Sequence, residues 1–296
     1  MIGLIWHYLY NSFLRSWLKW ILRKITGTCE LQRILAGSSQ GAEKTMKIEY
    51  SLVSSKSDVL RTSVTVSERG MATRVCDIMG VKNITPQKDP KFKLCLQICL
   101  LQISGYNTLY TDSENLRKQT FDSANVKHED MLMKLWNILM PRIHLESRIT
   151  KQWSDIGFQG DDPKTDFRGM GMLGLYNLVY FGEHYTEVAR QILSHSNHPK
   201  IGYSYAIVGI NLTEMAYSLL KSGALKAHFY NLVPGVPQMH HFHQFYCYLM
   251  YEFDKFWFKE EPQSIMEFNQ YREQFHERVK ELLKDPKAML TLEFNK

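Results

Sequence analysis

The sequence predicts an all-α, multi-helix globular fold, and three observations lead to this prediction. Apolar residues recur at steps of three and four, as in Leu132, Leu135 and Leu139. Strand signals are scarce, because no Asn-Gly or Asp-Gly pair separates two alternating runs. Ser264, followed three positions later by Glu267, has the capping-box pattern of a helix start. The 296 residues, 44% of them hydrophobic, suffice for a core of ordinary size.

The net charge indicates what kind of partner the protein binds, and the cysteine content indicates in which redox compartment it works. The net charge of +6 comes from scattered lysines and arginines, which suits an anionic membrane face or an acidic partner better than sequence-specific DNA reading. Five widely spread cysteines, an odd count, are typical of a reduced intracellular protein. Cys95 and Cys99 lie in the apolar run LCLQICLLQI, where thiols act as small buried hydrophobes.

The N-terminal segment, residues 1–27, is predicted to form an amphipathic helix. Residues 1–14 contain no Asp, Glu, Lys or Arg, and four lysines and arginines follow within ten positions. The uncharged run is too short to span a bilayer and lacks the charge order of a signal peptide. The helix either lies in a membrane interface or packs its aromatic stripe on the fold. The candidate membrane contacts are Trp6, Phe13, Trp17 and Trp20.

Downstream of this helix, three further parts of the chain are distinguished. We expect a helical region over residues 28–125, a helical domain over residues 126–288 and a tail over residues 289–296. A helix is expected to begin at Phe92 and end near Tyr110. It has no charge from Leu94 to Thr111, and its two glutamines and other polar side chains favour burial in a protein core over lipid. Further helices are expected at about 126–140, 145–155, 186–195, 199–221, 238–259 and 264–284, and another is expected to start near Arg168 and to include the periodic apolar run 172–180.

The densest run of residues with special backbone geometry is Trp153–Phe181, WSDIGFQGDDPKTDFRGMGMLGLYNLVYF. Gly157 follows an expected helix and is placed for a left-handed cap, and Gly160 frees the next turn. Pro163, between aspartates, indicates a further turn. The segment therefore reads as a structured loop that leads into an amphipathic helix.

The end of this loop carries two glycines at an expected helix start. Gly169 and Gly171 each disfavour a helix by about 1 kcal/mol relative to alanine, so close approach of another backbone, either inside the fold or from a partner, is the expected reason for their presence. Thr165 or Asp166 is placed to cap a helix that begins near Arg168.

Arg168 is the only basic residue between Thr165 and Phe181, and three roles are open to it. It could bridge Asp161, Asp162 or Asp166 and brace the loop. The aspartates could instead bind a metal, although they lack the spacing of a calcium loop. In the third interpretation the guanidinium faces outward, toward an anion or phosphoryl group. Residue chemistry alone leaves these alternatives open.

A family resemblance gives the loop a context. The stretch from Trp153 to Phe181 resembles the signature of the ELMO domain, and the similarity continues through HPKIGYSYAIVGINLTEMAYSLL and HHFHQFYCYLMYEFDKFWFKEEP. KITGTCELQRI and MKIEYSL, nearer the N-terminus, resemble the short ELMO domain-containing proteins. The resemblance covers the whole chain.

The resemblance implies a GTPase-activating protein for small GTPases of the Arf and Arf-like family. Arg168 corresponds to the arginine finger of that family, in the segment DFRG. The large engulfment scaffolds with the same domain lack this arginine. GTP and Mg²⁺ would belong to the GTPase, so no cofactor or metal of the protein's own is expected. The remaining residues expected to shape the loop or contact the GTPase are Trp153, Gly157, Phe158, Gln159, Gly160, Asp161, Asp162, Pro163, Thr165, Asp166, Phe167, Gly169 and Gly171.

Two alternatives come from other classes of protein. An effector or scaffold would bind the same GTPases without accelerating hydrolysis. A metal hydrolase would need ligands, but the histidines lack an HExxH pattern and adjacent residues on a helix diverge. By resemblance the protein is cytoplasmic, either free or peripheral on the endoplasmic reticulum, mitochondria or lipid droplets, and no nucleic-acid partner is expected. The histidines in question are His195, His198, His228, His240, His241 and His243.

Overall fold

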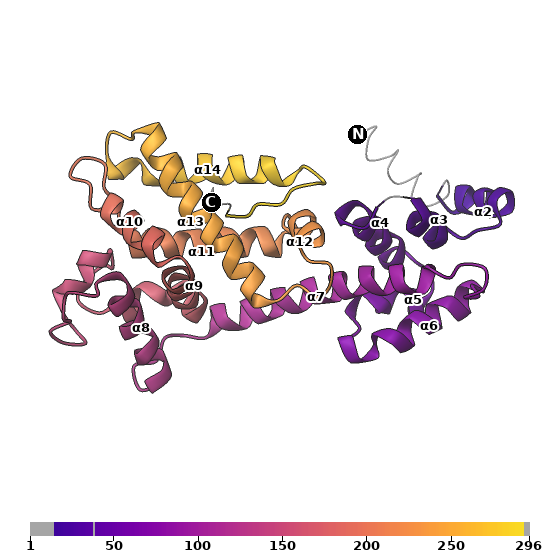
Figure 1. The fold of residues 1–296 in the computed structure, drawn as a ribbon, viewed down its shortest axis with the longest axis horizontal. Helices are drawn as coiled ribbons and strands as arrows, with labels where there is room; N and C mark the ends of the chain where they lie inside the picture. Colours follow the sequence, from indigo (N-terminus) through magenta and orange to yellow (C-terminus); the bar gives the residue numbers. More distant parts are fainter. Residues whose placement is uncertain (1–14, 38, 293–296) are drawn as a thin grey trace. The chain divides into compact units, whose positions relative to one another are not determined.

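The computed structural model describes residues 15–37 and 39–292, and its regular secondary structure over these residues is entirely helical (Figure 1). The all-α prediction is confirmed. The chain divides into two compact units, residues 1–107 with 230–236 and residues 108–229 with 237–296. Compactness alone does not define a domain, so the boundaries expected from the sequence stay predictions.

Unit 1 contains short helices and the first part of a long one. Its 3-10 turns are η2 (Thr62–Thr65) and η3 (Glu68–Gly70). Its helices are α2 (Arg15–Thr26), α3 (Glu30–Gly37), α4 (Ala42–Val53), α5 (Asp58–Arg61), α6 (Met71–Lys82) and the first part of α7 (Phe92–Lys118).

The α7 helix is a core helix where it crosses unit 1, as its glutamines indicated. Gln102 is fully buried, and its amide donates to the carbonyls of Tyr230 and Val233 at 2.9 and 2.6 Å. Its oxygen accepts from the Thr45 hydroxyl at 2.6 Å. Every polar atom of the side chain thus has a protein partner, which is the condition for burying an amide.

The expected end of this helix near Tyr110 is wrong, because α7 continues to Lys118. The added turns are polar, but their polar groups pair with one another. Arg117 donates to Glu114 at 2.6 Å, one turn away on the same helix, and the Tyr217 hydroxyl donates to the same carboxylate at 2.5 Å. Such pairs stabilise a helical turn that lacks an apolar stripe.

Unit 2 is arranged around α9 (Gly171–His184), which contacts four other helices and is buried on most of its surface. Figure 1 shows α9 between these helices. Between α8 and α9 lie the 3-10 helices η4 (Lys151–Ile156) and η5 (Pro163–Arg168). The other elements are α8 (Val126–Leu139), α10 (Thr186–Ser196), α11 (Tyr205–Lys221), α13 (Met239–Glu260), η6 (Ile265–Glu267) and α14 (Phe268–Leu283), while α12 (Lys226–Leu232) crosses the unit boundary.

Most helix expectations in unit 2 are confirmed, with three corrections. The helix expected at 145–155 is replaced by turns and the short η4. The helix expected from 199 begins only at Tyr205. Before it, Gly202 lies so close to other backbone that a Cβ would be 2.5 Å from the carbonyls of Ser196 and His198, which requires a tight turn. The α12 helix, seven residues long, was not predicted.

A buried polar cluster joins three helices of unit 2. His243 on α13 donates from Nδ1 to the Asn177 side chain on α9 at 2.6 Å, and the Asn177 amide donates to the Thr213 hydroxyl on α11 at 3.0 Å. Burial lowers the pKa of His243 to about 4, helped by neighbouring histidines. Burial likewise lowers the pKa of His228 to about 4. Both imidazoles are therefore neutral in the folded protein at neutral pH.

Stability should fall in mild acid because these two histidines take up protons when the chain unfolds. Their pKa is about 4 in the folded protein, against an ordinary histidine value of 6.5, so stability is full above pH 6.5 and is lost as the pH falls toward 4. Each group contributes a slope of up to about 1.4 kcal/mol per pH unit.

Urea unfolding across this pH range measures the slope. His243→Asn keeps a donor for Asn177 and should flatten the slope, whereas His144→Asn, at an exposed position, should not. An unchanged slope in His243→Asn would show that this histidine does not contribute to the acid loss of stability.

Candidate functional site

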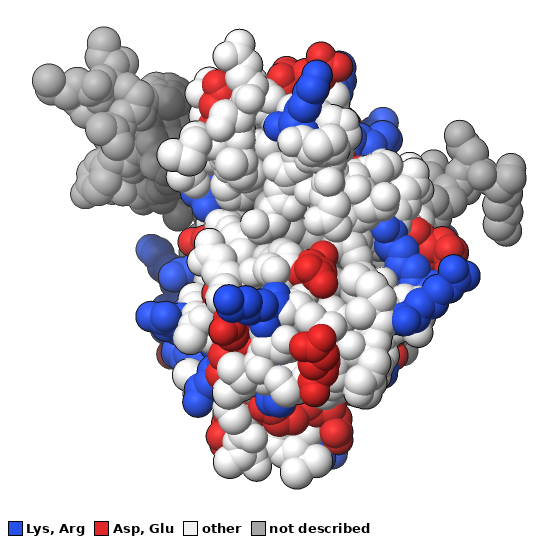
Figure 2. All heavy atoms as spheres, turned by 90° about the vertical axis from the view of Figure 1, so that its left-hand side faces the viewer, with Lys and Arg blue, Asp and Glu red and all other residues white. Residues whose placement is uncertain are grey.

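The segment between α8 and α9 is a loop with a buried inner side and an exposed outer side. Trp153, Phe158 and Phe167 are buried, whereas Gln159 and Arg168 are exposed. Figure 2 looks toward the left-hand side of Figure 1, where α8 and α10 lie. In that view of the described residues, acidic and basic side chains are interspersed among uncharged surface.

A row of aromatic side chains forms the floor of the loop. Trp153 packs edge-on against Phe158 with ring centroids 5.8 Å apart, and Phe158 packs against Phe167 at 5.5 Å. Phe167 stacks on Phe121 at 5.9 Å, and Trp136 meets the other end of the row at 5.4 Å from Trp153. Because Phe167 directly precedes Arg168, this packing fixes the backbone that carries the guanidinium.

Gly157 anchors the start of the loop on α11. It has φ +83°, and a Cβ at this position would lie 2.3 Å from the backbone nitrogen of Tyr205. The Gly157 carbonyl accepts from the Ile207 amide at 3.2 Å. The expected left-handed cap is confirmed, and the contact with α11 adds a second reason for glycine.

Gly171 anchors the end of the loop on the segment that follows α7. A Cβ here would lie 2.3 Å from the Arg117 carbonyl oxygen, and the next amide, of Met172, donates to the Gln119 carbonyl at 2.8 Å. Close backbone approach thus explains Gly171. Gly169 has no such contact inside the described fold, since a Cβ there would meet no atom within 4 Å, and approach of a partner's backbone to Gly169 stays a prediction.

Two aspartates hold the loop in shape, in roles that differ from the expected ones. Asp162 caps η5, because its carboxylate accepts from the Lys164 amide at 3.0 Å. Asp166 accepts from the Gln159 amide at 2.7 Å and so closes the loop on itself. Neither Thr165 nor Asp166 caps α9, which begins at Gly171 without a side-chain cap. The backbone after η5 therefore turns before α9 begins.

Burial raises the pKa of the Asp166 carboxyl from its ordinary value. The bond from the Gln159 amide and the positive charge of Arg168 act in the opposite direction. The aspartate and the arginine thus influence each other through space.

Arg168 ends η5 with an exposed side chain. Its Nε donates to the Thr165 carbonyl at 3.0 Å. Within residues 15–37 and 39–292, its two terminal amino groups have no hydrogen-bond partner and no carboxylate lies within 4 Å of the guanidinium. The bracing interpretation does not describe this structure, because Asp162 pairs with Arg148 at 3.0 Å and Asp166 with a backbone amide. The two terminal amino groups of Arg168 are therefore unpaired among the described residues.

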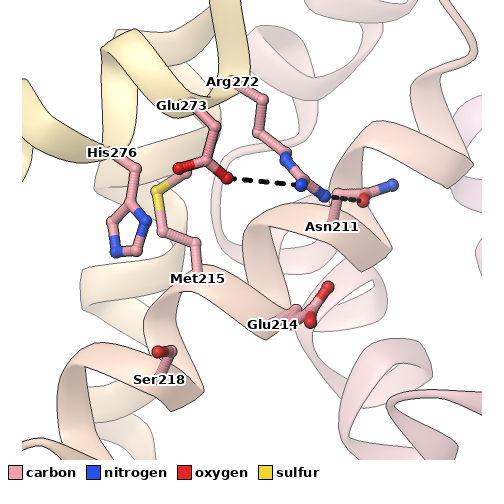
Figure 3. Close-up of a pocket in the computed structure, with 7 residues that line it drawn as sticks. All are labelled: Asn211, Glu214, Met215, Ser218, Arg272, Glu273 and His276. Carbon is pink, nitrogen blue, oxygen red and sulfur yellow. Dashed lines mark hydrogen bonds and ion pairs between the residues drawn. The ribbon is translucent and has the colours of Figure 1, made fainter. Parts of the chain in front are cut away.

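Arg272 shows how a braced arginine looks in the same unit. It lies beside a polar cavity of about 110 Å³ between α11 and α14, drawn in Figure 3. One terminal nitrogen donates to the Asn211 side chain at 2.8 Å, and the other is 3.4 Å from Glu273. Both ends of this guanidinium are engaged within the protein, unlike those of Arg168.

The histidines do not gather into a metal site. No group of three or more metal-ligating side chains exists among the residues that the structure describes. His195 instead pairs with the buried Asp254 at 2.8 Å. The expected divergence of His240 and His241 is wrong, since their ring centroids are 3.7 Å apart. His241 turns back to accept from the Gln238 amide at the start of α13, which brings the rings together.

The predicted membrane-contact residues are only partly described, since Trp6 and Phe13 lie outside the described residues. Trp17 and Trp20 on α2 are 63% and 59% exposed, and Ile25 is 75% exposed. The second interpretation, in which the aromatic stripe packs on the fold, requires these two tryptophans to be buried. They are exposed, so it does not describe them. None of the helices in the described part of the chain is long and apolar enough to cross a bilayer.

Sequence reasoning missed three residues that support the loop, namely Phe121, Trp136 and Arg148. Trp136 lies on α8, in the helix predicted from Leu132, Leu135 and Leu139, but its contact with Trp153 was not foreseen. Arg148 lies in a segment that was expected to be helical, so its ion pairs across the loop were not foreseen. No local pattern marks either long-range contact.

Comparison with known proteins identifies the family to which this architecture belongs. The sequence profile of the ELMO/CED-12 family matches residues 111–272, which include the whole loop. The chain belongs to the ELMO/CED-12 family, and the resemblance seen in the sequence is confirmed.

Relatives match over nearly the whole chain. It is 64% identical to human ELMO domain-containing protein 2 over 97% of this chain and 98% of the relative. It is 53% identical to mouse ELMO domain-containing protein 1, over 97% and 93%. ELMO domain-containing protein B of Dictyostelium discoideum is 34% identical, over 88% and 92%. No solved structure matches.

The two positive-φ glycines at the start of the loop allow a direct test of the anchor on α11. Gly160→Ala meets open space and should cost only the left-handed strain, about 1 kcal/mol. Gly157→Ala adds a clash with the α11 backbone and should cost about 3 kcal/mol or more. Urea unfolding measures both, and equal losses would contradict the anchor.

Proposed function

We propose that this protein is a GTPase-activating protein for small GTPases of the Arf and Arf-like family. The observation that carries the proposal is the exposed Arg168, whose terminal amino groups have no partner among the described residues. The aromatic floor and the anchors at Gly157 and Gly171 support it, because they fix the backbone of the loop. The family resemblance supplies the class of partner.

In the proposed mechanism the arginine acts in trans. The GTPase supplies Mg²⁺, the phosphate-binding loop and the residue that orients the attacking water. The guanidinium of Arg168 enters the nucleotide site and neutralises charge that develops on the γ-phosphate. Its planar fork suits this task, because two parallel N–H groups match phosphate oxygens. The exposed Gln159, Gly160 and Asp161 would then lie against the GTPase surface.

The fixed backbone has an energetic consequence in this mechanism. An arginine on a loose loop would lose conformational freedom on reaching the phosphate, and that loss would offset part of the transition-state stabilisation. Packing of Phe167 and capping of η5 by Asp162 restrict that freedom before the GTPase arrives. The side chain of Arg168 alone has to reorient, exchanging one bond to Thr165.

Arg168→Lys tests the finger role, because lysine keeps the charge but loses the fork. A finger is worth about 10³ to 10⁵ in rate, so most of the stimulated hydrolysis should be lost. Single-turnover hydrolysis by GTP-loaded Arf-family proteins measures it. Arg272→Lys is the matched control and should retain stimulation, because Arg272 is engaged inside the protein.

Two outcomes would contradict the proposal. Full stimulation by Arg168→Lys would exclude the finger role. Tight binding of a GTPase loaded with a non-hydrolysable GTP analogue, with no stimulation by the wild-type protein across a panel, would instead assign an effector or scaffold.

We further propose that the protein is cytoplasmic and that α2 contacts an anionic membrane surface at an intracellular membrane, where its GTPase partner is bound. Trp17, Trp20 and Ile25 are exposed, and Lys24 lies 5.8 Å from the Trp20 ring. Exposed tryptophans beside basic side chains are the combination that an interfacial helix uses.

Flotation with phosphatidylcholine vesicles containing phosphatidylserine tests this contact. Trp17→Ser combined with Trp20→Ser should reduce flotation several-fold, because the buried apolar area is lost. Met266→Ser removes an even more exposed apolar side chain, on η6, and should not reduce flotation. Undiminished flotation of the double variant would contradict membrane contact through α2.

A further inference from the structure

An ion pair between Arg148 and Asp162 connects the segment that precedes η4 to the start of η5. The terminal nitrogen Nη1 of Arg148 lies 3.0 Å from Asp162 Oδ1, and the same oxygen accepts the Lys164 amide at 3.0 Å. One carboxylate oxygen thus receives both the arginine and the backbone of η5. The six-residue η5 ends at Arg168, so the ion pair acts on the element that carries the proposed finger.

Arg148 is itself held from several directions. Its Nε donates to Glu129 on α8, and its guanidinium lies 5.6 Å from the Phe121 ring centroid. Its carbonyl accepts from the Trp153 indole at 3.0 Å. The side chain therefore connects α8 and the aromatic floor to η5. Arginine suits such a junction because its donors are fixed in a plane.

Backbone contacts reinforce the same connection. The Thr150 amide donates to the Asp161 carbonyl at 3.0 Å, so the stretch of chain after Arg148 runs beside the chain before η5. The Asp166 carboxylate, near the end of η5, accepts from the Gln159 amide at 2.7 Å and ties the end of η5 to the chain that follows η4. The loop is held at two places, and the Arg148 side chain links it to α8 through Glu129.

The chemistry of this pair favours a role in geometry over one in stability. Burial alone would lower the pKa of Arg148, but the bonds to Glu129 and Asp162 outweigh it and raise the pKa. The remaining terminal nitrogen, Nη2, is buried and has no partner. This ion pair is partly buried, so partial desolvation offsets part of its attraction, and the unpaired buried donor adds a cost. What the pair provides is a fixed direction for η5.

We propose that Arg148 is a positioning residue for Arg168: through Asp162 it sets the orientation of η5 and so places the finger for phosphoryl transfer. It does not touch the GTPase-bound nucleotide. This inference rests on the proposed function, since it assigns a role within the same site.

The test distinguishes the effect of the Arg148–Asp162 ion pair from the effect of the helix cap that Asp162 provides for η5. Asp162→Asn keeps an N-cap of equal quality but removes the charge that binds Arg148, and Arg148→Met removes the guanidinium while keeping much of the stem. Displacement of a catalytic group by about 1 Å costs about 10²-fold in rate. Both variants should therefore lower the kcat of stimulated hydrolysis by about 10- to 100-fold, with KM for the GTPase nearly unchanged.

A double-variant cycle gives the decisive readout. If the two residues act through one ion pair, Arg148→Met combined with Asp162→Asn should lose no more kcat than either single variant. Glu187→Gln, which removes the ion pair with Arg190 on α10 and leaves the loop's own contacts in place, is the control and should have a much smaller effect. Losses that multiply in the double variant, or full kcat in Asp162→Asn, would overturn the proposal.

Amide hydrogen exchange supplies a readout that does not need a GTPase. In Arg148→Met the Gln159 and Lys164 amides should exchange faster, while the Ile207 amide, bonded to Gly157, should not change. Unchanged exchange at Gln159 and Lys164 would overturn the positioning role by itself. If the wild-type protein stimulates no GTPase but exchange changes as expected, the proposed function fails and the structural link stands.

Discussion

The close backbone contacts at Gly157 and Gly171 are the constraint on which the candidate site depends. At each position a Cβ would lie 2.3 Å from another backbone atom. The backbone of α11 and that of the end of α7 therefore approach the loop so closely that only glycine fits at these two positions. These contacts bring the two ends of the loop against the helical core. The aromatic row from Trp153 to Phe167 fills the space that remains beneath it.

This anchoring divides the loop into parts with different tasks. The buried aromatic residues and the two anchoring glycines hold the backbone, and the aspartates satisfy amides within it. The terminal amino groups of Arg168 have no hydrogen-bond partner among the described residues, as is also true of the Lys164 ammonium in the same loop. Rigid support beneath an unpaired guanidinium is the arrangement that a finger supplied to another protein requires.

The local sequence was informative where short-range rules apply. Helix periodicity located α8, α9, α10 and α13, because an amphipathic face repeats within a few residues. The left-handed cap at Gly157 followed from glycine's backbone freedom. By contrast, the extension of α7 to Lys118 depends on the pairing of Glu114 with Arg117 and Tyr217, and Tyr217 lies about a hundred positions away. No local pattern could have indicated that partner.

The sequence by itself determined the helical class, the family and the identity of the loop, since these reside in periodicity and in a long, specific motif. Only the tertiary structure decided the partner of each aspartate: Asp162 forms an ion pair with Arg148, and Asp166 accepts a hydrogen bond from the Gln159 amide. It also decided that Arg168 has no carboxylate partner and bonds only to the Thr165 carbonyl among the described residues. The physical reason is that a charge takes its partner from what folding brings near, and nearness in sequence does not fix that choice.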